Sequence, residues 1–82
     1  MQPQVGMRGV IKNIEIGKDY GPAGLYFHPN MSKYISQPFV ITAIDRNWKD
    51  FFQIDIDDGY WTWCPEMVTF TPLKILKTRN PR

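Results

Sequence analysis

The stretch FFQIDIDDGYWTWCPEMVTFT at residues 51–71 constrains the fold more than any other part of the chain. Apolar residues recur at every second position across residues 52–56, which is the period of a half-buried strand. Asp58 and Gly59 then supply a two-residue turn of type I′, because glycine adopts positive φ freely and aspartate tolerates it. Residues 60–63 are strong strand formers, so the pattern predicts a β-hairpin.

Two registers are compatible with this hairpin. With the two-residue turn, the isoleucines of the first strand oppose Trp61 and Trp63, and both tryptophans join the core. With a three-residue loop at residues 57–59 and a bulge at the glycine, both tryptophans point outward. We favour the first register, which leaves Asp55 and Asp57 on an exposed strand face.

The other predicted strands lie on either side of this hairpin. Residues 5–16 alternate imperfectly and predict a first strand with bends at its glycines. The apolar, β-branched run at residues 39–44 predicts a central strand. Residues 65–67 fit one 3-10 turn, since proline favours the first helical position, and residues 68–71 form the last strand.

A long connection separates the first strand from the central one. Residues 17–38 contain three prolines, which are unfavourable in central strands. A helical turn is predicted near the end of this connection, with Asn30 as its cap and with Met31 and Tyr34 facing the core. Together the elements predict an all-β fold, a small five-stranded SH3-like barrel at residues 1–72 with a long first loop and a 3-10 turn before the last strand. A basic tail follows at residues 73–82.

Three short motifs resemble a group of small SH3-like barrel proteins encoded by phages and prophages. The motifs are Val5-Gly6-Met7-Arg8, Met31-x-x-Tyr34 and Trp61-x-Trp63-x-x-Glu66-Met67. The resemblance covers most of the first 70 residues and implies the barrel architecture and a mobile-element origin, with no assigned reaction. The acidic and aromatic signature of peptide-binding SH3 domains is missing, which argues against proline-rich ligands.

Composition limits the classes of protein to which the chain can belong. Eighty-two residues make one domain with a modest core, and twelve aromatic residues supply large side chains for it. Cys64 is the sole cysteine, which excludes an internal disulfide and favours a reducing compartment. No leader or membrane-spanning stretch is visible, so we expect a soluble, cytoplasmic protein, in the host cytoplasm if it is phage-encoded.

The residues that usually carry catalysis are sparse. His28 is the sole histidine and lies in a predicted loop, and no basic residue near Cys64 in the sequence would activate its thiol. The carboxylates at residues 55–58 lack the glycine and distal glutamate of a calcium loop. We therefore expect no enzymatic activity, no metal site and no cofactor.

Exposed aromatic residues point to protein binding. The candidates are Tyr20, Tyr26, Trp48 and Tyr60, because a few aromatic anchors usually carry most of the energy of an interface. In an SH3-like barrel the first loop and the second connection flank one side, so these residues are expected to converge. Nearby acidic residues favour a basic partner, such as a host enzyme or defence protein that normally binds nucleic acid: Asp45, Asp50, Asp55 and Asp57. The last strand also offers an edge for homodimer pairing.

Nucleic-acid binding is the alternative function. Small barrels stack bases on aromatic rings while basic side chains follow the phosphates. The tail supplies Lys74, Lys77, Arg79 and Arg82, and the body adds Lys12, Lys18 and Lys33. The acidic hairpin would repel a phosphate backbone, so this alternative ranks second.

Overall fold

A computed structural model describes residues 2–71 of the chain. Its elements are six strands and two 3-10 helices: β1 (Arg8–Ile11), β2 (Asp19–Tyr20), β3 (Leu25–Tyr26), η1 (Pro29–Tyr34), β4 (Pro38–Ile44), β5 (Phe52–Ile54), η2 (Pro65–Met67) and β6 (Val68–Phe70). No α-helix occurs among the described residues, so the predicted all-β class is confirmed.

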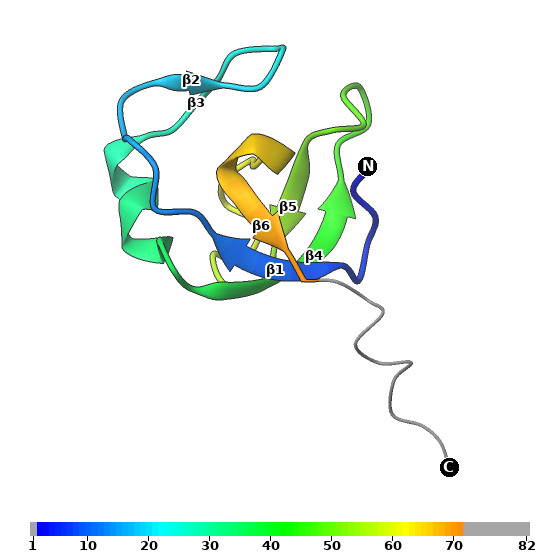
Figure 1. Ribbon diagram of the computed structural model, residues 1–82. Coiled ribbons are helices and arrows are strands. Elements are labelled where there is room, and N and C mark those ends of the chain that lie inside the picture. Colours follow the sequence, from blue (N-terminus) through cyan, green and yellow to red (C-terminus); the bar gives the residue numbers. More distant parts are fainter. Residues whose placement is uncertain (1, 72–82) are drawn as a thin grey trace.

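The strands form a four-stranded antiparallel sheet in the order β5-β4-β1-β6, while β2 and β3 pair separately. Figure 1 shows the β2–β3 hairpin at one end of the molecule, away from the four-stranded sheet. The last strand lies beside the first, with Ile11 opposite Val68. Within residues 2–71 the sheet is open, because β5 and β6 remain its two edges.

Close packing at β1 requires a glycine. Gly9 is buried, and a Cβ atom added there would clash with the carbonyl oxygen of Thr69 and lie 3.0 Å from the Phe39 ring. The absence of a side chain at Gly9 therefore lets β1 pair with β6 and at the same time pack against the Phe39 ring.

The core is dominated by aromatic and aliphatic side chains. Its fully buried members are Trp63, Phe27, Phe52, Ile11, Met31, Ile41, Ile54, Met67 and Cys64. Met31 and Tyr34 of η1 both face this core, as predicted, and the Tyr34 ring lies 6.1 Å from that of Trp63. The predicted cap is wrong: His28, and not Asn30, caps η1, because its Nδ1 accepts a hydrogen bond from the Asn30 backbone N–H.

The predicted hairpin is correct at its turn and wrong in its second strand. Asp58 and Gly59 have φ values of 56° and 74°, and the Tyr60 N–H donates to the Asp57 carbonyl at 3.0 Å, as a type I′ turn requires. Beyond this turn, residues 60–63 form only an isolated antiparallel bridge, between Phe52 and Trp63. Neither predicted register is present in the structure.

The carboxylate of Asp57 accounts for this departure. It accepts hydrogen bonds from the backbone N–H groups of Gly59 and Trp61 and from the Trp63 indole, each at 3.0 Å. With only 6% of its surface exposed, Asp57 is buried, and its predicted place on an exposed face is wrong. The Asp57 side chain thus takes the Trp61 N–H in place of a carbonyl of the opposite strand, and Trp63 enters the core while Trp61 stays half-buried.

Candidate partner-binding site

Trp48 presents a large apolar ring to solvent. It is 57% exposed, and its ring stacks on that of Phe51 with centroids 5.9 Å apart and planes 27° from parallel. An aromatic side chain offers a large contact area at a small cost in conformational entropy. The stacked pair is therefore a preformed apolar platform at the end of the sheet.

The turn between β4 and β5 holds this platform in place. One carboxylate oxygen of Asp45 accepts hydrogen bonds from the backbone N–H groups of Asn47 and Trp48, both at 2.9 Å. The two ends of the turn are also joined, since the Asp45 N–H donates to the Phe51 carbonyl at 2.9 Å. This side-chain-to-backbone arrangement fixes the backbone on which Trp48 is displayed.

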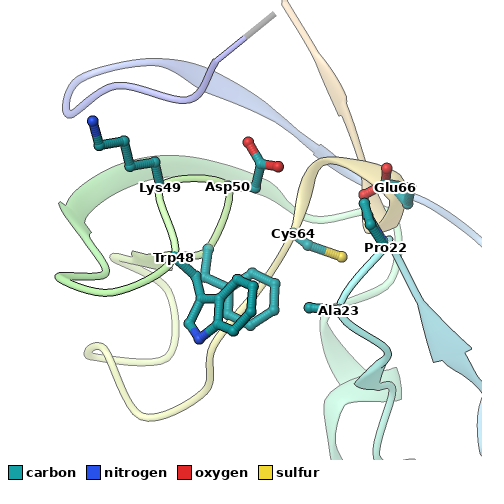
Figure 2. A pocket seen from close by; sticks show the side chains of 8 residues that line it. Pro22, Ala23, Trp48, Lys49, Asp50, Cys64 and Glu66 are labelled. Carbon is teal, nitrogen blue, oxygen red and sulfur yellow. The ribbon is translucent and has the colours of Figure 1, made fainter.

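Two further segments complete a pocket next to Trp48. The pocket has a volume of about 230 Å³ and lies between the first loop, the β4–β5 turn and η2. Figure 2 shows its lining side chains: Pro22, Ala23, Trp48, Lys49, Asp50, Phe51, Cys64 and Glu66. Segments distant in the sequence thus meet at one site, which we call the Trp48 pocket.

The first loop approaches η2 closely at Gly21. This glycine has a φ of +78°, and a Cβ atom at that position would lie 3.1 Å from Glu66 Oε1 and 3.4 Å from Cys64 Sγ. Burial, together with the negative charge of Glu66, raises the pKa of the Cys64 thiol to about 12. Cys64 is therefore a neutral thiol near pH 7 and contributes to packing, with no thiolate available as a nucleophile.

A second surface carries a row of four rings, which we call the aromatic row. Tyr26 contacts His28 edge to face with centroids 6.2 Å apart, and His28 stacks on Trp61 at 5.1 Å. Trp61 in turn meets Tyr60 edge to face at 5.0 Å. Tyr60 is 78% exposed and Tyr26 is 49% exposed, so the two ends of the row are open to solvent.

The predicted aromatic residues therefore occupy different environments. Trp48 lines the Trp48 pocket, while Tyr26 and Tyr60 end the aromatic row. Tyr20 is half-buried: its ring packs edge to face on Phe27, and its hydroxyl donates to the Glu15 carbonyl.

The predicted acidic residues also occupy different environments. Asp55 is exposed, and its carboxylate accepts a hydrogen bond from the Val40 N–H at 2.9 Å. Asp50 lines the Trp48 pocket, whereas Asp45 and Asp57 hold turns. The predicted acidic surface is thus smaller than the sequence indicated, because Asp57 is buried and the carboxylates of Asp45, Asp55 and Asp57 all accept hydrogen bonds from the backbone.

Six pocket residues were not singled out from the sequence as binding residues: Pro22, Ala23, Lys49, Phe51, Cys64 and Glu66. Their convergence depends on tertiary structure and leaves no local signal. The Asp45-x-x-Trp48 spacing is the one local signal that would have indicated a fixed turn, because a carboxylate commonly accepts hydrogen bonds from N–H groups two or three residues later.

The predicted nucleic-acid contacts Lys74, Lys77, Arg79 and Arg82 lie outside the described residues. Among residues 2–71, no group of three or more His, Cys, Asp or Glu side chains gathers in a way that would hold a metal ion. No helix in this part of the chain is long and apolar enough to cross a membrane. Comparisons with protein-family models, curated proteins and solved structures found no match.

Proposed function

We propose that this chain is a non-enzymatic binding module that engages a protein partner through the Trp48 pocket. The observation that carries the proposal is a tryptophan 57% exposed on a stacked platform that a hydrogen-bonded turn holds in place. Interfaces are enriched in such residues, and a few of them dominate the binding energy. No comparable argument supports catalysis, since Cys64 is a buried, neutral thiol and His28 caps a helix.

The size of the pocket favours a side chain of a partner over a small-molecule ligand. Its volume of about 230 Å³ is smaller than the roughly 300–1,000 Å³ of typical ligand pockets. A single side chain from another polypeptide needs less room, and flanking contacts outside the pocket would supply the rest of the interface.

An SH3-like barrel is the architecture we propose for the module. In support, β4, β5 and the bridged Trp63 follow one another as a meander, η2 comes next, and β6 then lies beside β1. A long connection also precedes β4, as that architecture requires. With the phage resemblance of the motifs, we infer that the module acts in a host cytoplasm, where it binds and inhibits a host protein.

The test compares Trp48→Ala with Tyr60→Ala, which truncates another exposed ring at a different surface. A partner captured from a bacterial lysate with the full chain is identified, purified and titrated against each variant by calorimetry. Truncation of a central aromatic anchor costs about 2 kcal/mol or more, so Trp48→Ala should weaken binding at least ~30-fold. Tyr60→Ala should leave the affinity within about threefold. Wild-type affinity of Trp48→Ala would exclude the proposed site.

Nucleic-acid binding through the aromatic row is the second candidate function. The exposed rings of Tyr26 and Tyr60 favour it, because bases stack on such rings, and Lys33 lines the same pocket as Tyr60 and Trp61 of the row. A fluorescent oligonucleotide would be titrated against the full chain and against a chain lacking residues 73–82. Binding that weakens steeply with salt and is lost on the deletion would support this candidate; binding unaffected by salt would exclude it.

A further inference from the structure

We propose that the Trp48 pocket receives a positively charged side chain, a lysine or an arginine, from the partner polypeptide. This inference rests on the proposed function and adds the chemistry of the residue that enters the site. It follows from the charges at the pocket, the character of its aromatic face and the apolar residues opposite that face.

Two acidic residues line the pocket, Asp50 and Glu66. Within residues 2–71 the one ion pair joins Lys18 to Glu15, so neither pocket carboxylate has a cationic partner there. Lys49 is the only cation among the lining residues, and Figure 2 shows its side chain directed away from Trp48. A cation entering the pocket would therefore meet negative charge without displacing an existing ion pair.

The negative charge of Glu66 reaches the inner part of the pocket. Its Oε1 lies close to the Gly21 backbone, because a Cβ atom on Gly21 would be 3.1 Å from it, and the Cys64 Sγ would lie 3.4 Å from the same Cβ position. The raised pKa of Cys64 has the charge of Glu66 as one of its causes, after burial. Glu66 is thus near enough to influence a charged group inside the pocket.

The aromatic and apolar surfaces suit the same occupant. The face of an indole ring attracts a cation through its quadrupole, and tryptophan is the best of the aromatic side chains in this respect. Pro22 and Ala23 line the pocket as well and offer apolar contact to a methylene stem. Lysine and arginine combine such a stem with a charged head, whereas an uncharged apolar side chain would gain nothing from the negative charges of Asp50 and Glu66.

The test uses small probes of defined charge. The full ¹⁵N-labelled chain is titrated with N-acetyl-lysine amide, N-acetyl-arginine amide and the uncharged N-acetyl-norleucine amide, and the Trp48 indole N–H signal is followed by NMR. We expect one or both cationic probes to bind about fivefold or more tightly than the norleucine probe. Equal binding of all three probes, or no shift at Trp48 with either cation, would overturn the inference.

A double variant, Asp50→Asn with Glu66→Gln, isolates the contribution of charge. Both substitutions keep the size of the side chain, and both positions are exposed, so the fold should persist and is checked by the dispersion of the amide spectrum. We expect the preference for cationic probes to fall to about twofold or less, and 0.5 M NaCl to weaken the wild-type preference. A preference unchanged in the double variant would count against the inference.

The same double variant separates this inference from the proposed function. If Trp48→Ala abolishes binding of the purified partner while the double variant binds as the wild type does, the Trp48 pocket is an interface, and a cationic occupant is excluded. If both variants lose affinity, both conclusions are supported. If Trp48→Ala binds the partner normally, the proposed function fails, and the inference fails with it.

Discussion

The carboxylate of Asp57 accepts a hydrogen bond from the indole N–H of Trp63 at 3.0 Å, and both side chains are buried. The same carboxylate accepts two backbone N–H groups, so a single side chain joins the type I′ turn to the largest residue of the core. This arrangement explains why the chain returns from the turn without forming a regular strand, and why an acidic residue occupies the interior of a small domain.

Asp57→Asn should destabilise the fold by about 2 kcal/mol. The asparagine amide offers one acceptor oxygen where three donors converge. Hydrogen bonds to a charged group are also stronger than those to a neutral one. Urea unfolding monitored by tryptophan fluorescence measures the effect. Asp58→Asn is the matched control, since Asp58 is exposed, its side chain makes no hydrogen bond within residues 2–71, and asparagine tolerates its φ of 56°. Equal losses in the two variants would contradict the role given to Asp57.

Asp45→Ala should release Trp48 from its fixed position. Two hydrogen bonds to the turn are lost, and by analogy with helix caps we expect a loss of stability of about 1 kcal/mol. The sharper expectation is a lower heteronuclear NOE at the Trp48 indole N–H, together with weaker partner binding. Asp45→Asn keeps an acceptor oxygen and should restore most of the rigidity; if it behaves like Asp45→Ala, hydrogen bonding is not what holds Trp48.

Ser36→Gly should stabilise the protein. Ser36 has a φ of +69°, which costs a residue with a Cβ atom about 1 kcal/mol and costs glycine little. The greater freedom of glycine in the unfolded chain offsets part of this gain, which leaves about 0.5 kcal/mol. Thermal unfolding compares the variant with Ser32→Gly, in which a helical residue is replaced; that control should lose stability. A lower melting temperature for Ser36→Gly would refute the expectation.

Cys64 should resist thiol reagents while the protein is folded. Near pH 8 its buried thiol stays protonated, because its pKa is raised from 9.0 to about 12, so a disulfide reagent should react only after unfolding in guanidinium. A raised folded-state pKa stabilises the protein fully below the unfolded value. That contribution is lost as the pH rises from about 9 towards 12.

The matching measurement is the stability of the wild type against that of Cys64→Ala between pH 8 and 11. Cys64→Ala is less stable at pH 8 because a buried side chain is shortened. Its stability should decline less than that of the wild type above about pH 9, since it has no thiol to deprotonate. Parallel declines, or rapid labelling of the folded wild type, would show that Cys64 is not shielded.

The sequence pattern predicted correctly the elements that local residue preferences and burial determine. The apolar run at residues 39–44 gave β4, and Pro65 gave the start of η2. The strand expected at residues 60–63 failed because strand propensity was outweighed by the Asp57 carboxylate, a tertiary feature with no periodic signal. The prediction that Asp57 lies on an exposed strand face was wrong for the same reason.

The candidate site was predictable only in part. Trp48 was identified from the sequence, because a large ring in a short polar turn has few ways to become buried, and it is exposed. The Trp48 pocket was not, since Ala23 and Glu66 lie far apart in the chain and meet only after the first loop packs on η2. Local patterns in a single sequence do not show which distant segments come together in the fold.

The pairing of β1 with β6 has a consequence for synthesis. Val10, near the start of the chain, has Thr69 as its neighbour in the sheet, so the order of translation separates the two partners by almost the whole domain. While the ribosome still holds residues 68–70, β1 has an unpaired edge, and the domain cannot complete its sheet. Folding of this domain to the native state therefore waits until residues 68–70 have emerged, and a chaperone has that interval in which to bind the exposed edge.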